Sequence, residues 1–425
     1  MAASKACLVV AFLVWNPRIS VNGLSASPSS RRDFVSGSVS AGILLSSQPT
    51  LGVSAASIAA STPSPLLVDK GLVQLPPMGL GAWAWGDALF WGYRPSEDGE
   101  LRKVFDFALS QGTGCLFDTA ELYGLGRSEQ LIGDFSKGSA NLQDKEAASL
   151  AKSPRVSVAT KFAPLPWRTT RESVVKAAKA SAGRLGVDSI DLYQIHFPNV
   201  YANEAYWDGL GDAYEQGLVK AVGVSNYGSA ALRACHAKLA KRGIPLATNQ
   251  IQLSLLYRCP LENGLIETCN ELGVKVIAYS PLALGFLTGK YGSDKPFPSG
   301  PRANIAKTLF AAPTSSGGGG GSGSGGSAAF DHLLSAMQEV SRAHGDAPLC
   351  QVALNWCIAK GAVPIPGART LTQAKQNLGA LAWSLTPDQV SALDSAAAPL
   401  PPLVPPEQSQ FPKADKDTGL IMFDS

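Results

Sequence analysis

Four side chains suited to acid–base chemistry stand at or just beyond the ends of three successive apolar segments. Asp118 ends CLFD, Tyr123 follows it in a glycine-rich loop, Lys161 lies in VATKF, and His196 lies in YQIHFP. Burying a lysine in an apolar strand is costly unless its ammonium is paired, and Asp118 is the obvious partner. We therefore predict that Asp118 holds Lys161 and that Lys161 lowers the pKa of Tyr123, so that this phenol can protonate an oxyanion near neutral pH. His196 is predicted to donate a hydrogen bond to a substrate oxygen.

Each of these residues alone also has an ordinary structural interpretation. Asp118 would be a loop acid or helix cap, and Tyr123 a half-buried loop aromatic. Lys161 would extend its apolar stem toward solvent, and His196 would be a hydrogen-bonded core histidine. Their occurrence together at successive segment ends favours the chemical interpretation.

The elements that must position these residues are apolar strands that alternate with helical patterns. The predicted strands are Met78–Trp83, Cys115–Thr119, Val156–Phe162, Ile190–Phe197, Ala221–Ser225, Leu246–Gln252, Val274–Ser280 and Ala362–Pro366. The predicted helices are Glu97–Ser110, Ser128–Lys137, Arg171–Leu185, Ala202–Gln216, Ser229–Arg242, Glu262–Leu272, Phe330–His344 and Leu349–Lys360. Such alternation predicts an α/β fold, a (β/α)8 TIM barrel in which the carboxyl ends of all strands meet at one face.

Several shorter signals refine this architecture. Gly186, Gly217, Gly243 and Gly273 directly follow predicted helices, where a left-handed residue is favoured. Leu72–Leu75 is predicted to be half of a small hairpin that seals the barrel floor. The barrel is expected to span residues 66–400, with a polar insertion at Asn141–Lys152, a flexible Gly/Ser-rich insertion at 313–327 and a C-terminal tail at 401–425.

Composition excludes several function classes. The chain has 425 residues, of which 45% are hydrophobic, so it is large enough for one barrel core. A net charge of +3 provides no basic field of the kind that binds nucleic acid. The seven cysteines form no CxxC pair and suggest reduced thiols with no metal site. We expect a small-molecule partner, no transmembrane span in the mature chain, and a monomer or weak oligomer.

The segments FDTAELYG, VATKF and YQIHFP resemble the catalytic segments of the aldo-keto reductases. By this resemblance Asp118, Tyr123, Lys161 and His196 are the family's catalytic tetrad, with Tyr123 as the proton donor. The resemblance covers roughly Leu72 to Leu385, and SVATKFAPLPWR and QGLVKAVGVSNY are most similar to plant-type plastid members. It implies NADPH-dependent reduction of an aldehyde or ketone to the alcohol. Two alternatives remain open: a pyridoxal reductase, and a cofactor-binding regulatory subunit resembling potassium-channel β subunits.

The same resemblance implies a set of residues that contact the cofactor, NADPH or NADP+. They are Ser225, Asn226, Gln250, Tyr279, Ser280, Pro281, Leu282, Lys290, Gly367, Arg369, Gln373 and Asn377. The first three are assigned to the nicotinamide carboxamide, Tyr279 to the face of the nicotinamide ring, and the last two to the adenosine end. Arg369 and Lys290 suit a ribose 2′-phosphate, which favours NADP over NAD. Alternatively, Ser225-Asn226 is an ordinary turn and helix cap, and Tyr279 is a core aromatic.

Four tryptophans follow the first and third predicted strands and are expected to line an aromatic substrate pocket. They are Trp83, Trp85, Trp91 and Trp167. Alternatively, these side chains only pack the loops around the barrel mouth.

The first 62 residues are predicted to be a targeting presequence. Ala6–Trp15 is apolar but too short to span a bilayer, and a serine-rich stretch with Arg31 and Arg32 follows it. A signal peptide followed by a transit-like segment resembles the presequences of plastids bounded by extra membranes. A twin-arginine signal for the thylakoid lumen, or a serine-rich tail with two chance arginines, are the alternatives. Because an NADPH consumer needs a compartment that regenerates NADPH, we predict the plastid stroma.

Overall fold

The computed structural model describes residues 67–69, 72–111, 116–143, 156–199, 201–292 and 324–400, all within a compact unit that begins at Pro63. The predicted presequence, the tail at 401–425, residues 313–323 of the Gly/Ser-rich insertion and residues 144–152 of the polar insertion lie outside these described residues. Within the described ranges, no helix combines the length and the apolar character needed to cross a membrane.

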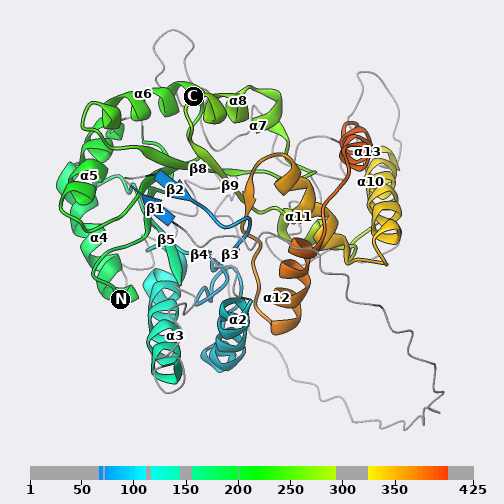
Figure 1. Cartoon of the computed structure of the whole chain (residues 1–425), viewed down its shortest axis with the longest axis horizontal. Coiled ribbons are helices and arrows are strands. Elements are labelled where there is room, and N and C mark those ends of the chain that lie inside the picture. Colours follow the sequence, from blue (N-terminus) through cyan, green and yellow to red (C-terminus); the bar gives the residue numbers. More distant parts are fainter. Residues whose placement is uncertain are drawn as a thin grey trace, which may run out of the picture. The chain divides into compact units, whose positions relative to one another are not determined.

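Eight parallel strands form a nearly closed barrel, as predicted, and neighbours in the chain are neighbours in the sheet (Figure 1). They are β3 (Gly79–Gly81), β4 (Leu116–Asp118), β5 (Ser157–Phe162), β6 (Leu192–Ile195), β7 (Val222–Ser225), β8 (Leu246–Gln252), β9 (Lys275–Tyr279) and β10 (Val363–Pro364). At the closing seam the Gly81 amide donates to the Pro366 carbonyl at 3.0 Å. A Cβ at Gly81 would lie 2.9 Å from the Ile365 carbonyl oxygen, so this close approach requires glycine.

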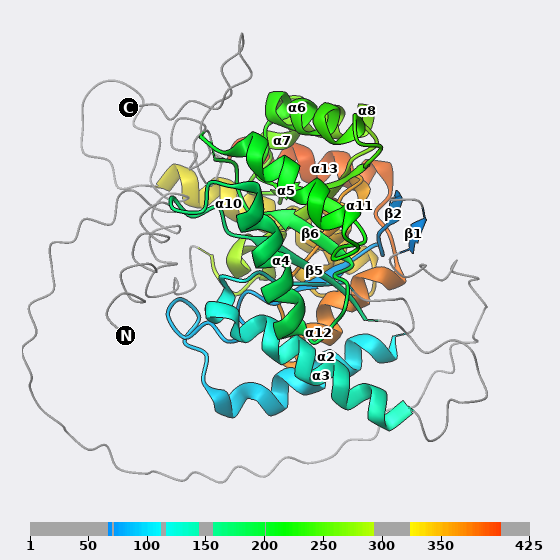
Figure 2. The same cartoon turned by 90° about the vertical axis from the view of Figure 1, so that its left-hand side faces the viewer.

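A small apolar layer fills the barrel at the first part of its strands. It consists of Leu116, Ala159, Leu192, Ala221, Ala247, Ile277 and Ile365. Leu75 packs against this layer and directly follows β2 (Leu72–Gln74), which pairs antiparallel with β1 (Leu67–Asp69). The predicted hairpin is therefore present, and it lies across one end of the barrel (Figures 1 and 2). The opposite end, where the strands finish, is left for function.

Helices surround the barrel and bury their apolar faces against it. They are α2 (Asp98–Ser110), α3 (Arg127–Gln143), α4 (Arg171–Leu185), α5 (Asn203–Glu215), α6 (Ser229–Ala240), α7 (Cys259–Glu262), α8 (Leu265–Glu271), α11 (Leu349–Ala359) and α12 (Leu371–Leu378). Gly186, Gly217, Gly243 and Gly273 all adopt φ between 68° and 70°. This left-handed conformation, which glycine adopts without strain, ends the helices where the sequence predicted.

Three elements differ from the prediction. The helix expected over Glu262–Leu272 is shorter, because Gly264 is left-handed with φ 78° and α8 begins only at Leu265, while Glu262 ends the separate short helix α7. Helix α10 (Ser324–Ala343) begins inside the predicted Gly/Ser-rich insertion. Helix α13 (Pro387–Ala397) was not predicted, although its capping box is visible in the sequence: Thr386 and Gln389 each bond the other's backbone N–H. Helices α10 and α13 lie side by side (Figure 1).

Candidate active site

The Asp118–Lys161 ion pair stands at the centre of the strand ends. Lys161 is fully buried, and its Nζ lies 2.6 Å from Asp118 Oδ2 and donates to the Thr119 carbonyl at 2.8 Å. Gln250, from β8 across the barrel, donates through Nε2 to Asp118 Oδ1 at 2.7 Å. The predicted pair is therefore present. Gln250, which also bonds the Asp118 carboxylate, was expected to contact the cofactor.

Tyr123 and His196 complete the cluster. Tyr123 begins the turn η2 (Tyr123–Gly126) after β4, and its hydroxyl accepts from Lys161 Nζ at 3.4 Å. His196 directly follows β6, and its ring lies nearly perpendicular to the Tyr123 ring, with centroids 5.6 Å apart. Among the described residues, Nδ1 of His196 has no hydrogen-bond partner. Three successive strands thus bring the four predicted side chains together, and the ordinary interpretation of each as an isolated loop or core residue does not describe this arrangement.

The prediction that Lys161 lowers the pKa of Tyr123 is wrong. Burial raises the pKa of the Tyr123 phenol well above its ordinary value of 10, and the Asp118 carboxylate raises it further. The reason is that desolvation of the buried phenol is the largest effect, and the Lys161 ammonium, itself paired with Asp118 at 2.6 Å, does not offset it. Tyr123 is therefore a neutral phenol, with its proton present, throughout the physiological pH range.

His196 is also neutral. Burial lowers the pKa of its imidazole well below 6.5, and the nearby Lys161 charge acts in the same direction. A neutral imidazole carries one N–H and one acceptor nitrogen, so His196 can donate one hydrogen bond without bringing a second positive charge into the cluster.

Two acids that sequence reasoning missed hold the loops in place. Glu121 accepts from the Ala163 amide at 2.6 Å and pairs with Arg168 at 2.7 Å, which ties the loop after β4 to the loop after β5. Glu129 is fully buried in α3, accepts from Thr160 beside Lys161, and forms an ion pair with a neighbouring helix. The available signal was the acid on an apolar helix face, because a fully buried glutamate needs partners.

A second group of side chains surrounds the cluster at the ends of β7, β8 and β9. Asn226 is left-handed, with φ 63°, and its Nδ2 donates to the His196 carbonyl at 3.1 Å and to Ser225 Oγ at 3.0 Å. Tyr279 donates its hydroxyl to Asn226 Oδ1 at 2.9 Å. Asn226 is not a helix cap, because α6 begins after Gly228 with no side-chain cap. The structure therefore joins these residues to the cluster through the main-chain carbonyl of His196.

The loop after β9 has an unusual backbone that suits an anionic ligand. Ser280, Ala283 and Leu284 all adopt positive φ, at 50°, 49° and 55°, although none is glycine. Such conformations are unfavourable for residues with a Cβ and concentrate at functional sites. Some turns of this kind bind phosphate groups through their backbone N–H groups, although here the Ala283 and Gly285 amides donate within the loop, to the Ser280 and Leu282 carbonyls. Lys290 lies exposed just beyond this loop, after η3 (Ala283–Thr288).

The predicted adenosine-binding residues gather between β10 and α12. The Arg369 amide donates to Gln373 Oε1 at 2.8 Å, and Asn377 Nδ2 donates to the Gly367 carbonyl at 3.2 Å. The Arg369 guanidinium already has two partners, because it donates to the Trp91 carbonyl at 2.8 Å and pairs with Glu97 at 2.6 Å. The contact between Arg369 and Glu97 was not predicted from the sequence.

Comparison with known proteins places these features in a family. Residues 77–398 match the model of the aldo/keto reductase family. The chain belongs to the aldo/keto reductase family. It is 42% identical over 342 residues to the chloroplastic pyridoxal reductase of Arabidopsis thaliana, covering 79% of this chain and 86% of that protein. Both the predicted family and the predicted barrel are confirmed.

Solved structures share the reductase fold. A glycerol dehydrogenase of Gluconobacter oxydans matches with a TM-score of 0.63 and 23% identity, over 86% of this chain and all of that one. An aldo/keto reductase of Klebsiella pneumoniae, solved with NADP and acetate, matches with a TM-score of 0.54 and 23% identity, over 76% and 92% of the two chains.

The four tryptophans predicted to line a substrate pocket of this reductase lie in different surroundings. The ring centroids of Trp83 and Tyr123 lie 6.3 Å apart, so Trp83 stands beside the cluster, and Trp91 packs edge-on against Trp83 at 5.4 Å. Trp85 is wrong as a pocket residue, because it is fully buried, donates to the Ala368 carbonyl and packs between Phe117 and Phe135 in the core. Trp167 is 57% exposed on the loop after β5.

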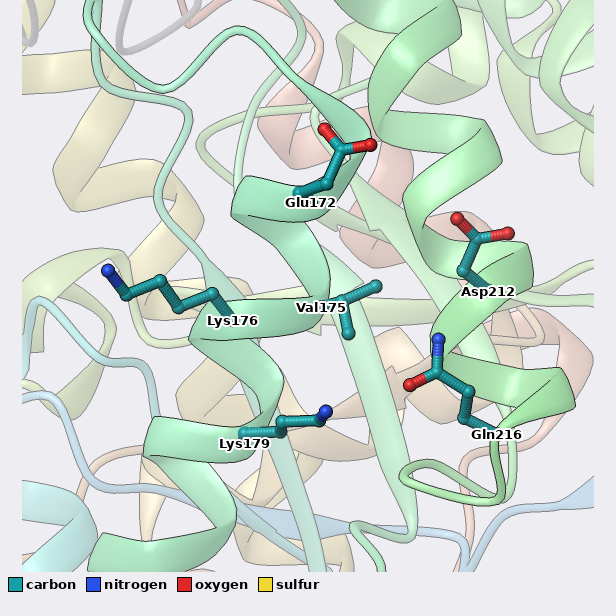
Figure 3. A pocket seen from close by; sticks show the side chains of 6 residues that line it. All are labelled: Glu172, Val175, Lys176, Lys179, Asp212 and Gln216. Atoms are coloured by element: carbon teal, nitrogen blue, oxygen red, sulfur yellow. The ribbon is translucent and has the colours of Figure 1, made fainter.

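A surface pocket of the reductase lies away from these strand ends. Figure 3 shows it between α4 and α5, where it is lined by Glu172, Val175, Lys176, Lys179, Asp212 and Gln216. Its charges have both signs, and Asp212 is already paired with Arg171 and Arg242. The pocket carries none of the predicted site residues.

Proposed function

We propose that this reductase transfers a hydride from NADPH to an aldehyde or ketone, with Tyr123 as the proton donor. One observation supports the proposal most directly. The neutral phenol of Tyr123 lies beside the buried, paired ammonium of Lys161 and the neutral imidazole of His196, at the carboxyl ends of the barrel strands. Such a cluster donates protons and hydrogen bonds to an oxygen that becomes negative during reaction.

Each residue of the cluster has a separate role in the reduction of the carbonyl group. When bound, NADPH supplies the hydride that reaches the carbonyl carbon. Tyr123 gives its proton to the carbonyl oxygen, which completes the alcohol. An alkoxide is a much stronger base than a phenolate, so a phenol with a raised pKa still donates. Lys161 then stabilises the phenolate until it is reprotonated, Asp118 and Gln250 fix the ammonium, and His196 directs its N–H to the substrate oxygen.

The cofactor is proposed to lie across the remaining strand ends. Ser225 and Asn226 would hold the carboxamide, Tyr279 would stack on the nicotinamide, and the left-handed loop after β9 would take the phosphates. Arg369 and Lys290 would meet the 2′-phosphate. Support comes from the positive φ values of that loop and from the NADP present in the Klebsiella structure.

An aromatic aldehyde is the proposed substrate class, with pyridoxal as its first candidate. The edge-to-face pair of Trp83 and Trp91 beside Tyr123 offers apolar surfaces to a planar ring. The Arabidopsis relative, at 42% identity, is named a pyridoxal reductase. The enzyme is expected to work as a monomer or weak oligomer.

A panel of carbonyl compounds tests this function. The purified enzyme, without its presequence, should oxidise NADPH when an aldehyde is added, and pyridoxal should give a higher kcat/KM than aliphatic aldehydes of similar size. The absorbance of NADPH reports the reaction, and pyridoxine formation confirms its product. Tight NADPH binding with no oxidation by any carbonyl would instead indicate a regulatory, cofactor-binding role.

The proposed location is the plastid, and within it the stroma. The Arabidopsis relative is chloroplastic, and a reductase that consumes NADPH needs a compartment that regenerates it. Residues 1–64 fused to a fluorescent protein should enter plastids and be digested when isolated thylakoids are treated with protease. A reporter protected inside the thylakoids would contradict the stromal location, and Arg31→Lys with Arg32→Lys should then block its entry.

A further inference from the structure

Glu97 forms an ion pair with Arg369, the residue whose guanidinium is proposed to bind the cofactor's 2′-phosphate. Glu97 ends the turn η1 (Pro95–Glu97) ahead of α2, and its Oε2 lies 2.6 Å from Arg369 Nη2. The two side chains are similarly half-exposed, at 31% and 30%. An approaching anionic ligand therefore meets a guanidinium whose charge is balanced by a carboxylate and which already donates one Nη2 N–H to it.

The second terminal nitrogen of the guanidinium, Nη1, bonds a different group. Arg369 Nη1 donates to the Trp91 carbonyl at 2.8 Å, and Trp91 packs against Trp83 beside Tyr123. A guanidinium has separate N–H donors on its two terminal nitrogens. Nη2 can therefore change partner while Nη1 keeps its bond to the loop that carries the aromatic pocket.

We propose that Glu97 determines cofactor preference by competing with the 2′-phosphate of NADPH for Arg369. The inference rests on the proposed function, because it takes the 2′-phosphate to bind at Arg369. The 2′-phosphate either replaces the Glu97 carboxylate on Nη2 or binds a remaining N–H beside it. In both cases the carboxylate stays a nearby negative charge that opposes the phosphate. NADH has a 2′-hydroxyl and leaves the ion pair intact. Glu97 thus weakens NADPH binding selectively and narrows the preference for NADPH over NADH.

Glu100, three residues after Glu97 in the chain, provides a matched control for the Glu97 substitution. Glu100, at the start of α2, accepts from the Leu371 amide at 2.9 Å and pairs with Lys103. Neither of these partners is Arg369. Glu100→Gln removes the same charge from the same neighbourhood as Glu97→Gln and keeps an oxygen that can accept from Leu371. It therefore reports the general effect of losing one negative charge near an anionic ligand.

The test measures binding without turnover, by titration calorimetry with 2′,5′-ADP, 5′-AMP, NADPH and NADH. Glu97→Gln should tighten the Kd of 2′,5′-ADP and NADPH by about five-fold, the equivalent of a half-exposed ion pair. The Kd of 5′-AMP and NADH should not change, and Glu100→Gln should leave all four near wild type. Tightening that is no greater than in Glu100→Gln, or weaker binding of 2′,5′-ADP, would overturn the inference.

Arg369→Ala separates this inference from the function on which it rests. It should weaken 2′,5′-ADP by about ten- to 150-fold, because a hydrogen-bonded charge is lost. In its presence Glu97→Gln no longer releases a guanidinium, so it should tighten 2′,5′-ADP no more than Glu100→Gln does. If Arg369→Ala leaves 2′,5′-ADP binding unchanged, the phosphate binds elsewhere and both assignments fail. If Arg369→Ala weakens binding but Glu97→Gln does not tighten it, only the competition by Glu97 fails.

Discussion

Replacing Tyr123 with phenylalanine should lower the turnover number for carbonyl reduction by a factor of about 10²–10⁴, the usual contribution of a general acid. The substitution removes one oxygen, which accepts from Lys161 at 3.4 Å, and leaves the ring that faces His196 and Trp83. The Kd of NADPH should stay at the wild-type value, because only the proton donor is lost. Turnover and cofactor binding are measured separately, by NADPH absorbance and by calorimetry.

Tyr93→Phe is the matched control for this substitution. It removes a phenol hydroxyl that donates to Asp98 at 2.6 Å, in the loop region before α2. Its turnover should remain near wild type. A Tyr123→Phe enzyme that retains a tenth or more of wild-type turnover would show that another group gives the proton.

Replacing Lys161 with methionine should destabilise the fold by about 3–5 kcal/mol, because it leaves the Asp118 carboxylate buried with no opposite charge. Asp118 is only 2% exposed, and Gln250 supplies it with a neutral donor at 2.7 Å. The double variant Asp118→Asn with Lys161→Met removes both charges and should recover most of that stability. Denaturant unfolding followed by circular dichroism gives the three free energies of unfolding.

The loss in Lys161→Met should depend on pH in a defined direction. Burial already raises the pKa of Asp118 above its ordinary value, and removing the Lys161 charge raises it further. A carboxyl whose folded pKa exceeds its unfolded value binds more protons when folded, so stability falls as pH rises above the unfolded pKa of about 3.9. Lys161→Met should therefore be closer to wild type at low pH than at neutral pH. Equal stability of wild type and Lys161→Met at neutral pH would contradict the account of the pair.

The sequence was sufficient to predict those parts of the fold and site that follow from local patterns. A lysine within VATKF had to find a partner if the strand was buried, and the neighbouring strand ended in Asp118. Gly186 and its equivalents had to end helices, because a left-handed residue follows a helix at low cost only where there is no Cβ. Chain order was enough to predict strand order, since successive parallel strands joined by helices are neighbours.

Features that depend on distant packing could not be predicted in this way. The pKa of Tyr123 depends on how deeply its phenol is buried and on how fully Asp118 neutralises Lys161. Trp83 and Trp85 look equivalent in sequence, but the chain turns after β3, with the Trp85 amide bonded to the Ala82 carbonyl, and Trp85 enters the core.

The pairing of charges across long stretches of chain was equally hidden. Glu97 and Arg369 are separated by 272 positions, and each had many possible partners among the charged residues. Gln250 reaches Asp118 across the barrel, 132 positions away, and only the closed sheet brings the two together. These contacts become visible only once the register of the strands is known.

Hydride transfer itself can be followed with NADPH that carries deuterium at its transferable position. In a single turnover, with enzyme and pyridoxal in excess over the labelled NADPH, the product alcohol should carry deuterium on the former aldehyde carbon. Tyr123→Phe should slow the formation of this deuterated alcohol. Absence of deuterium from pyridoxine and from every other alcohol of the carbonyl panel, with NADPH bound throughout, would contradict the proposal that this barrel is a carbonyl reductase.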